Sequence, residues 1–483
     1  MARSKNPVLI VHGWSDTSKS FRSLAKFLSS HGFQTVNLFL ADYISMEDDV
    51  SIDDAANAME RAVQAQISSG ALQLPFDLVV HSTGGLVARN WLASHYTGFA
   101  SDKMPVQRML MLAPANFGSA LATIGQTMLG RVAKGWDHGF HTGKLMLDGL
   151  ELGSPFQWEL ALRDLFAQGS VDGGTIYAPD LVWPFVLVGS MPYQTGLAQM
   201  VNEHGSDGTV RVVAANLNAY GATLDFTASA APTVLGMTAS NNAAALAHGA
   251  FTPWLHRYGE TMVFPLGVMN RRDHGSITDP ASRGDAESGA EQALFQQYLL
   301  SALNCNSFTD YQAIEQAWRS QSDQVQDPTS ADADHHSHLQ INVFVVDQYQ
   351  KPVSDYLIEF LAPNYQQNTD LTGVFHDKVI QDVHKCAQNS ALRTIYIDRQ
   401  NLFDLFYAAI PADMPKELRL SISASAPGNN VHYFENAYGA EGEFVVHSVD
   451  EASRWLHRNA THFLKIVIPR LPSDQVFKLA KFV

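Results

Sequence analysis

Ser82 has the surroundings of a catalytic nucleophile. The apolar run 76–80 before it has the length and β-branched content of a buried parallel strand, and residues 86–91 continue at helical spacing. Gly84 and Gly85 supply the small neighbours that a strained turn between a strand and a helix requires. This pattern predicts a nucleophile elbow, in which the serine hydroxyl is exposed above the sheet and backbone amides face a developing oxyanion.

One position departs from the usual elbow pattern. That pattern is Gly-x-Ser-x-Gly, whereas Val80 occupies the place of the first glycine. A β-branched residue crowds the turn there, so an alternative interpretation is a polar Ser-Thr-Gly-Gly loop that caps a helix. The residues further along the chain favour the elbow.

A serine hydroxyl needs a base to take its proton, and the base needs a carboxylate to orient it. In doubly wound hydrolases these groups follow the serine in the order Asp, His. Asp207 lies in a Gly-Ser-Asp-Gly-Thr-Val turn, and His274 lies in an Asp-His-Gly-Ser-Ile loop after a strand predicted over 261–266. We therefore predict Ser82 as nucleophile, Asp207 as acid and His274 as base.

Other residues compete for the same two roles. Asp207 has the alternative interpretation of an ordinary turn aspartate, and Asp172 and Asp180 are second candidates for the acid. His248 is the second-choice base, and His256 is a further candidate. Both histidines fall before the last predicted strand of the sheet, whereas a catalytic histidine is expected after it.

Two backbone amides are predicted to form the oxyanion hole. One is that of Thr83, the residue after the nucleophile, and the other is that of Trp14, in the His12-Gly13-Trp14 segment after the first strand. Trp14 has the alternative interpretation of a core aromatic. His81 is expected to be a packed or hydrogen-bonded strand residue.

The chemistry requires neither a metal nor a cofactor, and neither is predicted. The sequence contains no phosphate loop and no cofactor fingerprint. The His335-His336-Ser337-His338 cluster lacks the spaced ligands of a structural metal site, which favours a solvated linker.

The order of the elements predicts an α/β domain over 1–304 and a β domain over 339–483. In the first, strands alternate with helices as in a doubly wound, mostly parallel sheet. Its apolar helices in 119–176 are interpreted either as a cap over a substrate pocket or as peripheral helices. Residues 305–338 are predicted to be a connecting helix and a linker. Beyond them the hydrophobic period is two, which predicts an antiparallel β-sandwich.

Composition limits the partners. The 483-residue chain carries a formal net charge of −16, which argues against nucleic acid and against a purely electrostatic grip on anionic lipid. Its two cysteines imply no disulfide framework. No signal peptide or apolar run of about 18 residues is seen, so a cytoplasmic or peripherally membrane-associated protein is expected. The apolar C-terminal tail is expected to dock on its own domain, on another subunit of a homo-oligomer or on a membrane.

Together, the His12-Gly13-Trp14 segment, the His81-Ser82-Thr83-Gly84-Gly85 elbow, Asp207-Gly208 and the His274 loop resemble an α/β-hydrolase of the lipase and esterase kind. They are most similar to bacterial PlaB-type phospholipases A, which also carry an His-Ser-Thr-Gly elbow without the first glycine and append a C-terminal β-sandwich. The motifs cover residues 1–303, and the two-domain layout extends the resemblance to the end of the chain. The resemblance implies a C-terminal domain that assists membrane association and assembly.

The sequence thus predicts a serine carboxylic-ester hydrolase that cleaves lipid-like acyl esters, of phospholipase A type, through an acyl-serine intermediate. An acyl-thioesterase or an acyltransferase would use the same triad. A third alternative, from a different class, is a non-enzymatic lipid-binding scaffold that acts through the β domain.

Overall fold

The computed structural model describes most of the chain. The described residues are 5–13, 18–33, 38–44, 47–125, 143–167, 174–193, 202–227, 250–281, 287–326, 335–364, 367–425, 427–433, 444–449, 455–479 and 481.

The chain divides into two compact units. The first comprises Met1–Asn218 and Leu255–His336, and the second comprises Ala219–Trp254 and Ser337–Val483. This division differs from the expected domains at two places. Residues 219–254, expected within the α/β domain, contribute strands to the second unit, and residues 305–336, expected to connect the domains, belong to the first.

A six-stranded parallel sheet forms the centre of the first unit, in agreement with the predicted α/β fold. Its order is β2-β1-β3-β4-β6-β10, and every neighbouring pair is parallel. The strands are β1 (Val8–Val11), β2 (Leu38–Ala41), β3 (Phe76–His81), β4 (Val106–Leu112), β6 (Trp183–Gly189) and β10 (Leu266–Met269). The strand order reverses between β1 and β3, and in parallel α/β sheets ligands bind beyond the carboxyl ends of the strands at such a point.

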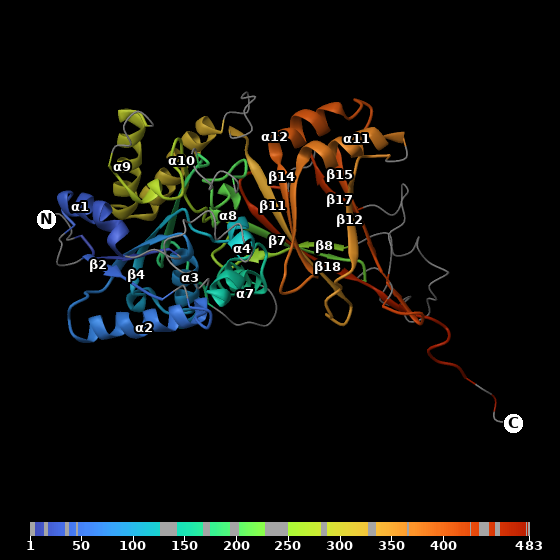
Figure 1. Cartoon of the computed structure of the whole chain (residues 1–483), viewed down its shortest axis with the longest axis horizontal. Helices are drawn as coiled ribbons and strands as arrows, with labels where there is room; N and C mark the ends of the chain where they lie inside the picture. Colours follow the sequence, from blue (N-terminus) through green and yellow to red (C-terminus); the bar gives the residue numbers. More distant parts are fainter. Residues whose placement is uncertain are drawn as a thin grey trace. The chain divides into compact units, whose positions relative to one another are not determined.

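Helices cover both faces of this sheet (Figure 1). Helices α2 (Ile52–Ser68) and α3 (Thr83–His95) lie on one side, and α1 (Arg22–Ser30) and α9 (Gly289–Leu303) on the other. Strands β1, β3 and β6 are buried along their whole length, as the apolar runs predicted. Capping boxes at Ser51 and Ser288 begin α2 and α9.

The last strand of the sheet begins later than predicted. The sequence predicted a strand over 261–266, but β10 starts at Leu266. Pro265 has no N–H to donate to a neighbouring strand, and its carbonyl accepts from Val186 N–H (2.9 Å). Phe264 packs instead against the rings of Tyr177 and Tyr258.

Helix α10 (Phe308–Val325) extends into the stretch that was expected to be a linker, and it packs within the first unit. Trp318 is buried and stacks on Tyr298 of α9, with ring centroids 4.7 Å apart. Ser322 Oγ accepts a hydrogen bond from Val268 N–H of β10 (2.9 Å). Because only one face of the helix is buried, its composition is mostly polar and resembles that of a linker.

The segment predicted as a cap is described in part. It contains α4 (Ala120–Gly125), α6 (Lys144–Leu150) and α7 (Pro155–Asp164), while residues 126–142 and 168–173 lie outside the described residues. A buried ion pair, Arg89 Nε to Asp164 Oδ2 at 2.8 Å, ties α7 to α3. The role as a cap stays a prediction. The short elements α8 (Val212–Ala215), β5 (Phe166–Ala167) and β9 (Leu255–His256) complete this part of the unit.

The second unit contains a mixed six-stranded sheet, which corrects the prediction of purely antiparallel pairing. Its order is β13-β14-β11-β18-β7-β8, and the pairs β11–β18 and β18–β7 are parallel. Alternation in the sequence reveals the buried face of a strand but not the direction of its partner. The strands are β7 (Ala219–Asp225), β8 (Ala250–Pro253), β11 (His338–Asp347), β13 (Ile380–Lys385), β14 (Leu392–Asp398) and β18 (Thr461–Ile468).

A second, antiparallel sheet in this unit has the order β12-β15-β17. It consists of β12 (Tyr356–Leu361), β15 (Glu417–Ala424) and β17 (Phe444–Ser448). Side chains of both sheets, among them Ile341, Phe360 and Leu420, belong to one hydrophobic core. The arrangement as a sandwich stays a prediction. The remaining elements include α11 (Thr369–Val374), α12 (Arg399–Asn401), β16 (Val431–Tyr433) and β19 (Arg470–Pro472).

Buried His462 in β18 is expected to make stability depend on pH. Its Nδ1 donates to the Gln340 carbonyl (3.2 Å) and its Nε2 accepts from His457 N–H (2.8 Å), an arrangement that only the neutral ring can make. Burial, with a contribution from His457, lowers the pKa of His462 to about 3. Because the unfolded ring takes up a proton near pH 6.5 and the folded ring does not, stability falls as the pH falls between these values.

Lowering the pH from 6.5 to 5 should therefore cost about 2 kcal/mol through this residue. Urea unfolding at several pH values, for the parent chain and for His462→Phe, measures the effect. The free energy of unfolding of the variant should depend less on pH over this range, by a slope that corresponds to about one proton. An unchanged slope would contradict the assignment of this effect to His462.

Candidate active site

Ser82 occupies a strained turn between β3 and α3. Its φ and ψ are 52° and −124°, a conformation that residues other than glycine rarely adopt. Three backbone hydrogen bonds hold it: Ser82 N–H donates to Leu112 O (3.1 Å), while Ser82 O accepts from Gly85 N–H (3.0 Å) and Ala115 N–H (3.2 Å). The backbone at Ser82 is therefore fixed from both sides, as a nucleophile elbow requires.

Close backbone packing explains why glycines are needed around this turn. A Cβ on Gly84 would lie 2.6 Å from His12 O, and one on Gly13 would lie 2.7 Å from Ser82 Cβ. Val80, in the place of the first glycine of the usual pattern, is fully buried in the sheet. Gly13, which follows the carboxyl end of β1, and Gly84 thus both provide the space that the turn needs.

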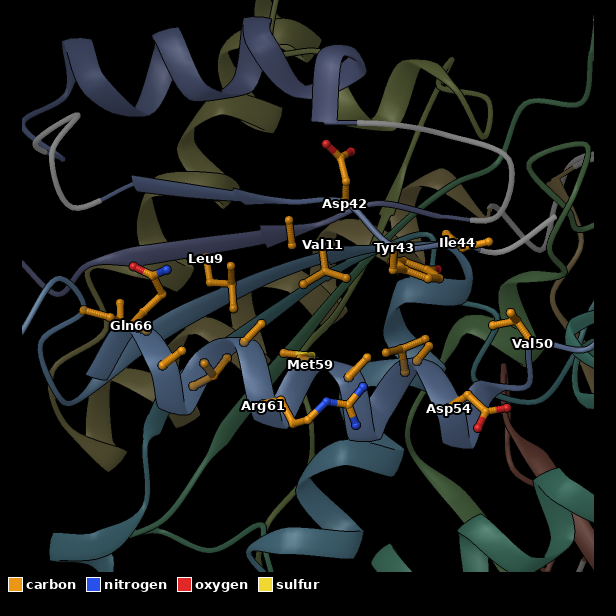
Figure 2. A pocket seen from close by; sticks show the side chains of 18 residues that line it. Leu9, Val11, Asp42, Tyr43, Ile44, Val50, Asp54, Met59, Arg61 and Gln66 are labelled. Carbon is orange, nitrogen blue, oxygen red and sulfur yellow. The ribbon is translucent and has the colours of Figure 1, made fainter. Parts of the chain in front are cut away.

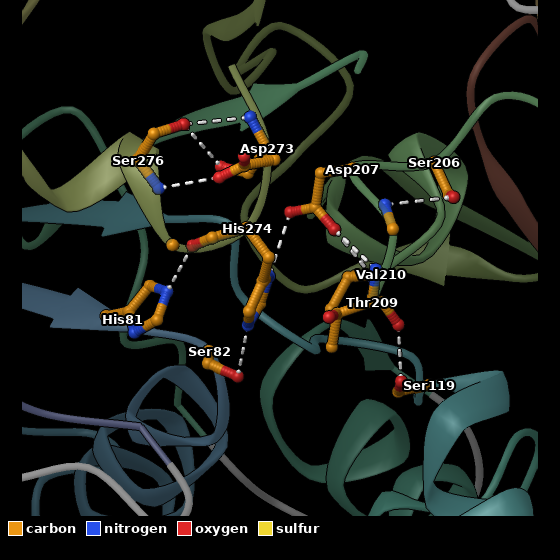
Figure 3. Close-up of polar contacts among 12 residues, drawn as sticks. His81, Ser82, Ser119, Ser206, Asp207, Thr209, Val210, Asp273, His274 and Ser276 are labelled. Atoms are coloured by element: carbon orange, nitrogen blue, oxygen red, sulfur yellow. Dashed lines mark hydrogen bonds and ion pairs between the residues drawn. The ribbon is translucent and has the colours of Figure 1, made fainter. Parts of the chain in front are cut away.

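The structure brings together the three residues predicted for the triad (Figure 3). His274 Nε2 lies 3.0 Å from Ser82 Oγ, and His274 Nδ1 lies 2.8 Å from Asp207 Oδ2. Asp207 is completely buried, while Ser82 and His274 are 8% and 9% exposed. These residues come from the ends of β3 and from loops after β6 and β10, so the parallel sheet aligns them at one edge.

The loop that carries Asp207 fixes the direction of its carboxylate. Asp207 Oδ1 accepts hydrogen bonds from the backbone N–H groups of Thr209 (3.0 Å) and Val210 (2.8 Å). The other oxygen, Oδ2, is thereby turned toward His274. Behind the loop, buried Arg211 pairs with Glu203 through two hydrogen bonds of 2.8 and 2.7 Å.

A buried ion pair holds the loop that carries His274. Arg272 donates to both carboxylate oxygens of Glu287 at 2.8 Å and to the carbonyls of Ser276 and Asp279 at 2.7 Å. His274 N–H also donates to Asp207 O (3.0 Å), which joins the two loops through their backbones. Arg272 was not predicted from the sequence, although its position two residues before a candidate catalytic histidine is a signal that could have identified it.

His81 contacts the backbone of His274. Its Nε2 donates to His274 O (3.0 Å), and the two rings lie 4.7 Å apart. Burial, reinforced by the neighbouring His274, holds the pKa of His81 well below its usual range, so the ring stays neutral. The sequence predicted a packed or hydrogen-bonded strand residue. Its partner, 193 residues away in the chain, was not predicted.

Removing this donor should displace His274. In His81→Phe the ring volume remains but His274 O loses its hydrogen bond, so we expect kcat for ester hydrolysis to fall about 10- to 100-fold with little change in KM. His81→Gln, which retains an N–H donor, should recover most of this loss. Steady-state kinetics of both variants measure the effect, and equal losses in the two would assign His81 a packing role only.

The remaining site predictions have different outcomes. Thr83 is buried and begins α3, where a backbone N–H has no acceptor within its own helix, so its amide is available for an oxyanion. Trp14, Asp172 and His248 lie outside the described residues. His256 packs against Phe166 and is not part of the Ser82 hydrogen-bond chain in the described residues.

Asp180, the other second candidate for the acid, is exposed. Within the described parts of the chain, no group of three His, Cys, Asp or Glu side chains is placed to hold a metal ion.

A family model described as a domain of unknown function, DUF7379, matches residues 1–131. No curated protein sequence matches the chain. Two solved structures of the phospholipase PlaB from Legionella pneumophila are similar over almost the whole length. The structure described simply as phospholipase PlaB has a TM-score of 0.77 at 23% identity, covering 99% of this chain and 97% of PlaB. The complex of PlaB with thio-NAD has a TM-score of 0.75 at 24% identity, covering 99% and 96%. The predicted resemblance is thus confirmed for the fold.

Proposed function

We propose that this chain is a serine carboxylic-ester hydrolase that cleaves acyl esters of lipids, in the manner of a phospholipase A. The observation that carries the proposal is the continuous hydrogen-bond chain from Ser82 through His274 to the buried Asp207, with the serine on a strained elbow. The similarity of the fold to a protein named as a phospholipase supports the choice of a lipid ester.

The geometry supports a two-step reaction. His274 Nε2 takes the proton of Ser82 Oγ as this oxygen attacks the ester carbonyl carbon, and Asp207 holds the opposite ring nitrogen and stabilises the imidazolium. The N–H groups of Thr83 and of Trp14 would donate to the oxyanion, and the loss of one such donor costs about 3 kcal/mol of transition-state stabilisation. His274 then protonates the leaving alcohol.

Hydrolysis of the acyl-serine repeats these steps with water. His274 takes a proton from the water as its oxygen attacks the acyl carbon, and the proton returns to Ser82 Oγ when the carboxylic acid leaves. All proton transfers pass through one imidazole, whose tautomer is set by Asp207. No metal or cofactor takes part in the proposed steps.

Covalent labelling tests the assignment of the nucleophile. A fluorophosphonate, which reacts with serines activated by a base, should label the wild-type chain once, and peptide mass mapping should place the label on Ser82. The Ser82→Ala variant should remain unlabelled, whereas Ser68→Ala, which changes an exposed serine at the end of α2, should label like the wild type. A label on any other serine would contradict the proposal.

The location of the enzyme on a membrane is a further part of the proposal. Among the described helices, none has both the length and the apolar content needed to cross a bilayer. We propose that contact with lipid is peripheral and involves the second unit. Co-sedimentation of the Ser82→Ala chain with phospholipid vesicles tests this, and a chain that stays in the supernatant would contradict it.

A further inference from the structure

A groove with a largely apolar lining runs between strand β1 and helix α2 in the first unit (Figure 2). Its volume is about 590 Å³, within the range of about 300–1,000 Å³ that is usual for ligand sites. Leu9 and Val11 point from β1 toward α2, and Met59 and Val63 line it from the helix. Polar side chains among the described lining residues belong to Asp42, Tyr43, Asp54, Arg61 and Gln66.

The lining of the groove follows helix α2 over most of its length. Its lining on α2 runs from Asp54 to Gln66, which at 1.5 Å per residue corresponds to about 18 Å. Each leaflet of a bilayer has a hydrocarbon layer about 15 Å thick, half of the total core. An extended acyl chain of a membrane lipid therefore matches the groove in both length and polarity.

One end of the groove lies beside the candidate active site. Tyr43 lines the groove, its ring stacks on that of His12 at 4.4 Å, and its N–H donates to His12 Nε2 (3.1 Å). The residue after His12 is Gly13, where a Cβ would lie 2.7 Å from Ser82 Cβ. A series of contacts thus leads from the groove to the elbow, through Tyr43, His12, Gly13 and Ser82.

From these observations we propose that the groove binds the acyl chain of the ester substrate, with the carbonyl carbon at Ser82 and the hydrocarbon tail along Val11 and Leu9. This inference rests on the proposed function and adds a specificity to it, a preference for long-chain acyl groups. Burial of each methylene favours binding by about fourfold. The rate should therefore rise with chain length until the groove is filled.

Ala62 is a position at which a substitution can fill the groove without disturbing the core. It lines the groove, is exposed on α2 and tolerates a larger side chain at small cost to the helix. Ala62→Trp should obstruct the groove. Ala71→Trp, a change of the same size at an exposed residue just after α2 that does not belong to the lining, is the matched control.

The first readout is the ratio of kcat/KM for p-nitrophenyl palmitate to that for p-nitrophenyl butyrate. Ala62→Trp should lower this ratio at least tenfold, and Ala71→Trp should leave it at the wild-type value. An unchanged ratio in Ala62→Trp would overturn the inference. So would a change of oligomeric state in size-exclusion chromatography with the ratio unchanged, because the groove would then be a contact between two copies of the chain.

The second readout does not depend on turnover. The fluorescent long-chain fatty acid cis-parinaric acid should bind to the Ser82→Ala chain, palmitate should displace it, and adding Ala62→Trp should weaken its binding at least tenfold. Equal binding with and without Ala62→Trp would overturn the inference even if esters are cleaved. If Ala62→Trp weakens binding while the wild-type chain cleaves no ester, the groove is supported and the proposed function is contradicted.

Discussion

His274→Ala should lower kcat for ester hydrolysis by about 10⁶-fold, because the variant lacks the base that accepts the proton of Ser82 Oγ. His274 Nε2 lies 3.0 Å from Ser82 Oγ, and among the described residues no other side chain is hydrogen-bonded to this oxygen. Steady-state assays with a soluble p-nitrophenyl ester measure the loss of kcat.

Two control variants make this result specific for His274. His256→Ala removes a histidine that packs on Phe166, away from the triad, and should leave kcat unchanged. His248→Ala tests the second-choice base of the sequence analysis and should also retain activity. If His248→Ala is inactive while His274→Ala is active, the base has been assigned to the wrong histidine.

Asp207→Asn should lower kcat by about 10⁴-fold with the fold unchanged. The backbone N–H groups of Thr209 and Val210 require an acceptor at the position of Oδ1, so the introduced amide must turn its NH₂ group toward His274 Nδ1. Nδ1 then has to accept a hydrogen bond, which places the ring proton on Nε2, facing Ser82. In this tautomer His274 cannot take the serine proton.

Measurements of folding and a control variant distinguish this cause from misfolding. Circular dichroism and urea unfolding of Asp207→Asn should match the parent chain, while Asp180→Asn, at an exposed second candidate for the acid, should keep full kcat. An Asp207→Asn variant with more than a tenth of the parent kcat would show that another group orients the base.

The elbow could be predicted because its determinants are local. A strand, a serine and two glycines within ten residues specify the turn, and the structure adds the tertiary reason for Gly84, its 2.6 Å approach to His12 O. The order Ser82, Asp207, His274 was also visible, and these residues are brought together. Their catalytic roles stay predictions.

What could not be predicted depends on contacts between distant parts of the chain. The parallel pairing of β18 with β7 joins segments more than 200 residues apart, so residues 219–254 were expected to belong to the α/β domain. The hydrogen bond from His81 to His274 O is of the same kind. The start of β10 differs from the prediction for a local reason, because Phe264 is typical of a strand whereas Pro265 has no N–H to donate to a neighbouring strand.

The most direct test of a lipid-ester hydrolase with Ser82 as nucleophile is fatty acid release from phosphatidylcholine vesicles, measured beside hydrolysis of soluble p-nitrophenyl esters, for the wild type and Ser82→Ala. The wild type should release fatty acid from vesicles, and Ser82→Ala should release none. Activity of the wild type on soluble esters alone would support the assignment of the triad but contradict the proposal of a lipid substrate. Undiminished release by Ser82→Ala would show that Ser82 is not the nucleophile.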